Sequence, residues 1–165
     1  MARIFIAIQL SERFKQPLLE AQGKLRELGV TGNYPPKDNL HLTISFIGFT
    51  DKVDLIKQAM SEIKFEPFTI TTSNLGCFNT ERVKVLWMGV EESEPLQSLA
   101  TAVRQKLQEY GIGHDLKPYA AHITLVSKPS TFITDLKTSP AQMLVEKISV
   151  MESISESTGP EYVER

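Results

Sequence analysis

Apolar residues recur along this chain at two spacings, one typical of strands and one typical of helices. Runs rich in Ile, Val and Phe predict strands at 3–9, around His41, at 65–78, at 83–90, around His122 and at 141–153. Apolar residues that return every three or four positions predict helices at about 12–28, 52–62 and 94–110. The polar turn NTER should join two of the strands as a hairpin, and the tail STGPEYVER predicts one more edge strand.

A strand, a helix and a second strand follow one another in each half of the chain, and the second strand carries the same short motif. The motif is His, an apolar residue and Thr: His41-Leu42-Thr43 in NLHLTISFIG and His122-Ile123-Thr124 in YAAHITLVSK. We interpret the repeat as an internal duplication within one two-lobed domain, residues 1–165. The alternative is that any α+β domain with helices packed on sheets shows some alternation of this kind.

Strand geometry determines which side chains of the two motifs lie together. Residues i and i+2 of a strand project from the same face, so each histidine shares a face with the threonine of its own motif. The opposite faces are apolar, formed by Leu40, Leu42, Ile44 and Phe46 in the first strand and by Ala121, Ile123 and Leu125 in the second. Two such strands related by a pseudo-twofold axis would bring two imidazoles and two hydroxyls to a shared cleft.

This set of groups suits displacement at phosphorus. One imidazole removes a proton from the nucleophile and the other protonates the leaving oxygen, while the hydroxyls hold nonbridging oxygens. A strained, singly charged cyclic phosphate needs no metal for this reaction. The alternative for either motif alone is a structural or surface histidine, but finding threonine at i+2 from two of only three histidines favours chemistry. The third, His114, has no such partner and is interpreted as a surface residue.

Composition excludes several other classes of protein. The 165 residues suit one domain, and 18 Lys+Arg against 20 Asp+Glu leave a net charge of −2, so no global positive field attracts a long duplex. Cys77 is the single cysteine, and no Cys/His cluster has the spacing of zinc ligands. The apolar N-terminal stretch is too short to span a membrane and lacks a signal cleavage site. We expect a cytoplasmic monomer without a metal, a cofactor or membrane contact.

Five stretches carry a resemblance to a known family: RIFIAIQL, NLHLTISFIG, NLGCF with VLWMGV, AAHITLV and STGPEYVE. They resemble the two-histidine phosphoesterase superfamily, in its branch of RNA 2′,3′-cyclic phosphodiesterases, also called 2′-5′ RNA ligase-like proteins. The resemblance implies a bilobal α+β fold of pseudo-twofold antiparallel sheets, with helices outside and a central cleft. It implies hydrolysis of RNA 2′,3′-cyclic phosphate ends to 2′-phosphates. His41 would be the proton donor, His122 the proton acceptor, and Thr43 and Thr124 the phosphate-binding hydroxyls.

The chain departs from this family after the second motif. Many members carry an arginine three residues after the second threonine, where this chain has Ser127 followed by Lys128. A lysine one position later points to the other strand face unless the backbone bends, and it lacks the planar two-pronged contact of arginine. The change bears on substrate affinity or choice more than on the chemistry. Ala121 also replaces a frequent proline.

Aromatic residues are weaker candidates for substrate contact. Strict alternation places Phe46 opposite His41, which favours core packing over base stacking. Tyr119 and Phe78 fall near loop or strand ends, where a ring either stacks on a nucleotide or covers the core. Trp87 is interpreted as a core residue.

Other functions stay open at this point. The same site could hydrolyse 2′-5′ linked oligonucleotides or another nucleotide cyclic phosphate, or could join RNA ends. A protein of a different class, a nucleotide- or RNA-binding module without turnover, would not need two acid-base groups.

Overall fold

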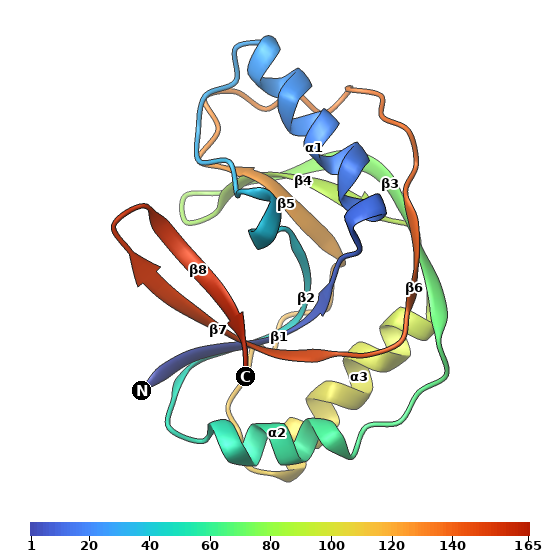
Figure 1. The fold of residues 1–165 in the computed structure, drawn as a ribbon, viewed down its shortest axis with the longest axis vertical. Helices are drawn as coiled ribbons and strands as arrows, with labels where there is room; N and C mark the ends of the chain where they lie inside the picture. The colour runs from blue at the N-terminus through green and yellow to red at the C-terminus, as the bar shows by residue number, and fades with distance from the viewer.

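Eight strands form the two sheets of the protein, in a computed structural model that describes residues 1–165 (Figure 1). They are β1 (Ala2–Gln9), β2 (His41–Thr50), β3 (Phe68–Asn79), β4 (Lys84–Val90), β5 (His122–Ser127), β6 (Gln142–Val145), β7 (Ser149–Glu156) and β8 (Gly159–Glu164). The strand orders are β2-β1-β7-β8 and β5-β4-β3-β6, and every pairing is antiparallel. The two histidine strands, β2 and β5, are therefore the corresponding edges of two matching sheets. The expected bilobal α+β fold is confirmed.

Three helices flank the sheets: α1 (Glu12–Glu27), α2 (Val53–Ser61) and α3 (Glu94–Glu109). A short 3-10 helix, η1 (Lys37–Asn39), leads into β2. Ser11 caps α1 and Ser93 caps α3, each through a side-chain oxygen that accepts a backbone N–H at 3.2 Å. Gly29 and Gly111 follow the ends of these helices with φ of 85° and 69°, the backbone region that glycine adopts without steric cost. None of the three helices has the length and apolar character needed to cross a bilayer.

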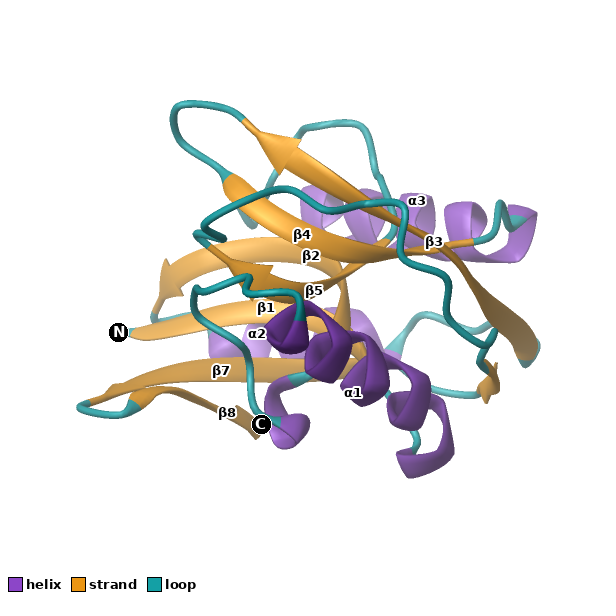
Figure 2. Ribbon diagram, turned by 90° about the horizontal axis from the view of Figure 1, so that it is seen from above, coloured by secondary structure: helices purple, strands orange, loops and turns teal.

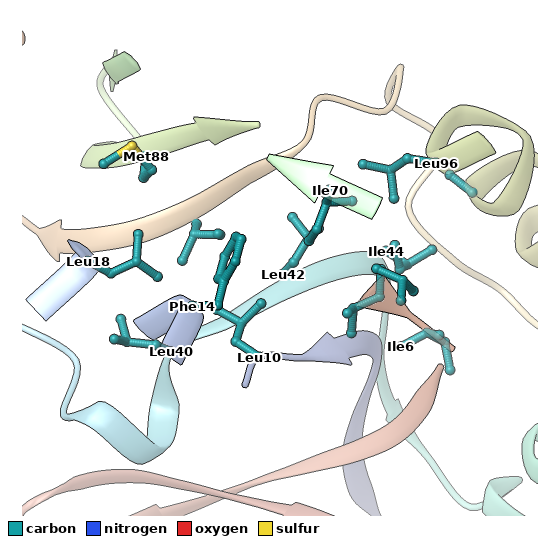
Figure 3. Close-up of a cluster of buried hydrophobic side chains, with 14 of the residues drawn as sticks. Ile6, Leu10, Phe14, Leu18, Leu40, Leu42, Ile44, Ile70, Met88 and Leu96 are labelled. Atoms are coloured by element: carbon teal, nitrogen blue, oxygen red, sulfur yellow. The ribbon is translucent and has the colours of Figure 1, made fainter. Parts of the chain in front are cut away.

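The helices lie at opposite ends of the molecule. Figure 1 places α1 at one end and α2 with α3 at the other, and Figure 2 shows strands of both sheets between α1 and α3. One continuous core of 31 buried residues connects all of these elements. Figure 3 shows part of this core, where Phe14 of α1, Leu42 of β2 and Ile70 of β3 lie close together. The two lobes are thus one packing unit.

Hydrogen bonds cross between the two halves of the chain in a matching pattern. Gln22 of α1 donates from Nε2 to the Leu125 carbonyl of β5 at 2.9 Å, and the Tyr119 hydroxyl donates to the Thr43 carbonyl of β2 at 2.9 Å. Both acceptors lie on sheet edges, where a strand lacks a neighbour on one side. Two loops cross in the same way: Asn33 forms an isolated antiparallel bridge with Ser127, and Asp115 N–H donates to the Phe46 carbonyl. The internal duplication itself stays a prediction.

A β-bulge follows the threonine of each motif. Ala7 pairs with Thr43 but Ile6 pairs with Ser45, so Ile44 is the extra residue in β2. In β5, Trp87 of the neighbouring strand pairs with Thr124 and Leu86 pairs with Val126, so Leu125 is the extra residue. Each bulge resets the alternation by one position. The residue three positions after each threonine, Phe46 or Ser127, therefore returns to the histidine face.

The strand pairings correct two predictions. Phe46 does not join the core: it pairs with Phe5, and its side chain is 50% exposed. Trp87 is also outside the core, because it pairs with Thr124 and shares its face, whereas its neighbours Leu86 and Met88 are fully buried. Strict alternation in β2 and the apolar character of tryptophan had favoured the interior for both side chains.

The segment 141–153 is not one strand. It divides into β6, which pairs with β3, and β7, which pairs with β1 in the other sheet. The polar residues Glu146 and Lys147 occupy the crossing between the sheets. The expected edge strand at the C-terminus is present as β8, and the β3–β4 hairpin forms as predicted.

Candidate active site

His41 and His122 begin β2 and β5, and the backbone orients both rings in the same manner. Nδ1 of His41 lies 2.7 Å from the Asn39 carbonyl oxygen, and Nδ1 of His122 lies 2.8 Å from the Ala120 carbonyl oxygen. A carbonyl only accepts, so Nδ1 of each neutral ring carries the proton and Nε2 is left as the acid-base atom. In both cases the carbonyl belongs to the residue two positions earlier.

The charge of His122 acts on His41. Burial lowers the pKa of His41 below its ordinary 6.5, the hydrogen bond to the Asn39 carbonyl opposes this, and the charges of His122 and Lys15 lower the pKa further. The structure therefore brings the two predicted acid-base residues within electrostatic reach of one another. At neutral pH the substrate-free protein holds His41 as the uncharged imidazole.

Thr43 and Thr124 lie on the same sheet faces as the histidines, as the alternation predicts. Both are half-buried, between the fully buried pairs Leu42/Ile44 and Ile123/Leu125. The predicted pair of imidazoles and pair of hydroxyls thus lie on the histidine faces of two edge strands. No group of three or more His, Cys, Asp or Glu side chains converges anywhere in the chain, so no ready set of metal ligands is present.

Aromatic rings enclose the first histidine. The Phe5 ring lies 4.9 Å from His41 and the Tyr162 ring 5.0 Å, both measured between ring centroids, with Tyr162 edge-on. Tyr162 belongs to β8, and the Asn39 side chain donates to the Pro160 carbonyl at 2.8 Å, which ties this strand to the start of β2. The C-terminal β7–β8 hairpin therefore forms a wall of the His41 half of the cleft.

Aromatic rings also flank the second histidine. The Phe78 ring lies 4.9 Å from His122 and edge-on to it, and the Trp87 ring lies 6.1 Å away. The indole lies against Gly76 on the next strand, where an added Cβ would come within 2.2 Å of the ring. Its Nε1 is buried without a hydrogen-bond partner. The sequence predicted that the indole lies in the core. The true position of the indole depends on which residues of β3 and β5 pair with Trp87, and the sequence of β4 alone does not specify this pairing.

The 2′-5′ RNA ligase superfamily sequence model matches residues 15–155. The chain belongs to the 2′-5′ RNA ligase superfamily. Two relatives named RNA 2′,3′-cyclic phosphodiesterase agree with this. The one from Archaeoglobus fulgidus is 31% identical, with 97% of this chain and 96% of the relative covered. The one from Thermotoga maritima is 29% identical, with 97% and 91% covered.

Solved structures of two proteins show the same fold. Escherichia coli LigT complexed with 3′-AMP superimposes with a TM-score of 0.82 at 22% identity, covering 99% of this chain and 95% of LigT. TT0787 of Thermus thermophilus superimposes with a TM-score of 0.76 at 26% identity, covering 98% and 94%. The resemblance to the two-histidine phosphoesterases that the motifs carry is therefore confirmed.

Four further residues were weaker candidates for substrate contact: Phe46, Tyr119, Ser127 and Lys128. The bulge returns Phe46 and Ser127 to the histidine face, and both are at least partly exposed. Lys128 is exposed and has a φ of 51°, so the backbone bends at the residue where the sequence required a bend. The Tyr119 hydroxyl is already engaged by the Thr43 carbonyl, and burial raises its pKa far above the ordinary value. Contact between these residues and a substrate stays a prediction.

Two other residues occupy places that the sequence did not predict. His114 is half-buried rather than at the surface, with Nδ1 3.0 Å from the Ile112 carbonyl oxygen. Lys15 is a buried cation on α1 near His41. Its position between the buried residues Phe14 and Leu18 was the available signal, but a lysine in an amphipathic helix is usually interpreted as solvated.

Proposed function

We propose that this protein hydrolyses the 2′,3′-cyclic phosphate at the end of an RNA chain to a 2′-phosphomonoester. The observation that carries the proposal is the pairing of His41 and His122, each on an edge strand with Nδ1 held by a backbone carbonyl and Nε2 left for proton transfer. Membership of the 2′-5′ RNA ligase superfamily and relatives named RNA 2′,3′-cyclic phosphodiesterase support it. One chain supplies both histidines, so a monomer is sufficient for the reaction.

The reaction is one in-line displacement. His122 accepts a proton from water as the water oxygen forms a bond to phosphorus, and the bond from phosphorus to the 3′ oxygen breaks. His41 donates its proton to that departing 3′ oxygen. Thr43 and Thr124 hold the nonbridging oxygens through neutral hydrogen bonds. The products are a 2′-phosphate and a free 3′ hydroxyl, and the two histidines exchange protonation states in each turnover.

The environment of His41 is compatible with the role of donor. Burial lowers its pKa in the free protein, so the imidazolium is a strong acid when it forms. A bound phosphate brings a negative charge into the cleft and favours that imidazolium. Substrate binding and protonation of His41 are therefore linked, and the proton is delivered where negative charge develops on the leaving oxygen.

The aromatic rings favour a nucleotide over a small phosphate ester as the substrate. Phe46 is half-exposed on the histidine face of β2, and Trp87 lies on the histidine face of β4. Exposed rings beside a phosphate site offer stacking surfaces for bases, each worth about 1–3 kcal/mol.

The test is turnover of 2′,3′-cyclic AMP and of a short RNA ending in 2′,3′-cyclic phosphate, in excess EDTA, with the phosphate position determined by phosphorus NMR. We expect 2′-phosphate as the product. His41→Ala and His122→Ala should each abolish most turnover and leave nucleotide binding nearly intact. His114→Ala is the matched control and should keep the wild-type rate. Binding of the RNA without turnover would instead indicate a nucleotide-binding module.

A second substrate class deserves the same assay. Ser127 occupies the position that the bulge returns to the cleft, where the family frequently has arginine. A hydroxyl contributes one neutral hydrogen bond, whereas arginine offers a charged, two-pronged contact. We therefore include 2′-5′ linked oligonucleotides, tested for both cleavage and joining. A higher kcat/KM for these than for the cyclic phosphate would favour this alternative.

A further inference from the structure

Lys15 is the one positively charged side chain buried in this protein. Its residue surface is 8% exposed, and it lies between Phe14 and Leu18, two core residues of α1 that are fully buried. Burying a cation costs free energy unless a partner compensates it. The structure therefore raises the question of which anion balances this charge.

No acidic side chain forms an ion pair with Lys15. Glu12, one turn earlier on α1, lies within electrostatic reach of Lys15 but pairs with Lys37. The side-chain nitrogens that are closed off from solvent without a hydrogen bond belong to Trp87 and Arg104. The Lys15 ammonium is thus reachable from solvent, although its aliphatic stem is enclosed by the core.

The helix that carries Lys15 begins close to the first histidine. Gln9, the last residue of β1, pairs in register with His41, and α1 begins three residues later. The first turns of α1 therefore start next to the beginning of β2. The charge of Lys15 also acts on His41, which places the two groups within electrostatic reach of one another.

The other half of the molecule has no equivalent cation. Lys15 follows the capping residue of α1, Ser11, by four positions, and Gln97 follows the capping residue of α3, Ser93, by four positions. Gln97 is exposed and uncharged, whereas Lys15 is buried and charged. Of these two equivalent positions, only the one on α1 carries a buried positive charge. A single phosphate held toward His41 would match this asymmetry, and two equivalent phosphates would not.

We propose that the Lys15 ammonium binds a nonbridging oxygen of the substrate phosphate beside His41. The inference rests on the proposed phosphodiesterase function. Lys15 would supply the positive charge that many family members obtain from an arginine at the position of Ser127. Its ammonium is a compact point charge, whereas the guanidinium of arginine is planar. The bound phosphate gives the Lys15 ammonium the partner that no side chain of the protein supplies.

The experiment compares Lys15→Met, which keeps the aliphatic stem and removes the charge, with Lys57→Met, an exposed lysine of α2. KM and kcat for 2′,3′-cyclic AMP and the inhibition constant of 2′-AMP are measured at 50 and 300 mM salt. We expect Lys15→Met to raise KM and the inhibition constant about tenfold or more and to flatten their dependence on salt. Lys15→Arg should restore most of the affinity, and Lys57→Met should match the wild type.

A change of less than twofold in both constants for Lys15→Met would overturn the proposal. So would a fall in melting temperature with unchanged affinity and salt dependence, since that pattern describes a structural lysine. If the wild type turns over neither cyclic substrate, the proposed function fails. Calorimetric titration with inorganic phosphate then tests whether Lys15 binds an anion. Weaker phosphate binding in Lys15→Met than in Lys57→Met then supports the anion site, and equal binding refutes it.

Discussion

Burial keeps several titratable side chains of the cleft uncharged. It lowers the pKa of His41, and it raises the pKa of Tyr162, whose ring lies edge-on to His41. Both shifts favour the neutral form at neutral pH, because transfer of a charge out of water is unfavourable. The free protein therefore presents a neutral imidazole and a neutral phenol at this end of the cleft. Positive charge there comes from Lys15, from Arg3, which acts on Tyr162, and, after protonation, from His41 itself.

The lowered pKa of His41 predicts a loss of stability in mild acid. Below its ordinary value of 6.5 the unfolded chain takes up a proton at this position before the folded chain does. The unfolded state binds more protons, so the free energy of unfolding falls as pH decreases, by at most about 1.4 kcal/mol per pH unit for this one group. We expect the decrease to begin near pH 6.5 and to continue down to the folded pKa.

Urea unfolding of the wild type and of His41→Asn between pH 7.5 and 5 measures this dependence. The wild type should lose more stability across the range than His41→Asn. Identical slopes for the wild type and His41→Asn would show that His41 does not titrate differently in the folded state. The range ends above the ordinary pKa of carboxyl groups.

At the scale of elements, the helices follow the local signals in the sequence and the strand faces do not. Ser11 and Gly29 bound α1 because capping and helix termination depend on a few adjacent residues. The face that Phe46 occupies depends on a bulge opposite β1, a residue pairing that the sequence of β2 alone does not specify. The two histidines and threonines were predictable because they precede both bulges.

Side chains placed by neighbouring strands escaped prediction for the same reason. Trp87 lies on the histidine face because Gly76 on β3 leaves room for the indole. The burial of Lys15 depends on the elements that pack against α1. Helical periodicity in the sequence indicates only which face of the helix is apolar. Sequence reasoning thus found the acid-base groups of the site and missed much of the surrounding wall.

Replacing Gly76 should disturb the His122 half of the site. In Gly76→Ala the added Cβ would come within 2.2 Å of the Trp87 ring, so the indole must move away from its place near His122. We expect kcat/KM for 2′,3′-cyclic AMP to fall about tenfold or more, since displacement of a wall residue by about 1 Å disturbs positioning. Trp87 is the only tryptophan, so its fluorescence emission reports the movement directly.

Gly23→Ala supplies the control, because an added Cβ at this position of α1 meets nothing within 4 Å. That variant should keep its activity and gain slightly in stability, as alanine favours a helix by about 1 kcal/mol over glycine. An unchanged emission spectrum together with unchanged activity in Gly76→Ala would refute the placement of the indole.

At the scale of the whole molecule, the two lobes hold each other at their open edges. The Tyr119 hydroxyl satisfies the Thr43 carbonyl of β2, and Gln22 satisfies the Leu125 carbonyl of β5. Each bond joins a residue of one half of the chain to the histidine strand of the other half. The separation of the two histidines is therefore set by contacts between the lobes and by the common core.

Removing one of these bonds should loosen the cleft. Tyr119→Phe deletes a hydroxyl that donates to the Thr43 carbonyl at 2.9 Å, and we expect a loss of about 1 kcal/mol in the free energy of unfolding. Because Thr43 is displaced with its carbonyl, kcat should fall as well. Thermal unfolding and steady-state kinetics measure the two effects. Tyr110→Phe is the control: its hydroxyl contacts Glu62 at the exposed surface, and its loss should leave both quantities near wild type.

The crossing of α1 onto β5 also sets an order of events during synthesis on the ribosome. Gln22 and its acceptor Leu125 are 103 positions apart in the chain. At about 5–20 residues per second, the acceptor is made roughly 5–20 seconds after Gln22. During that interval α1 lacks its partner on β5, while Leu42 of β2, which packs near Phe14, is already made. The nascent chain thus carries an incompletely covered first helix until β5 is made, and a chaperone that binds exposed apolar helices would encounter it in this period.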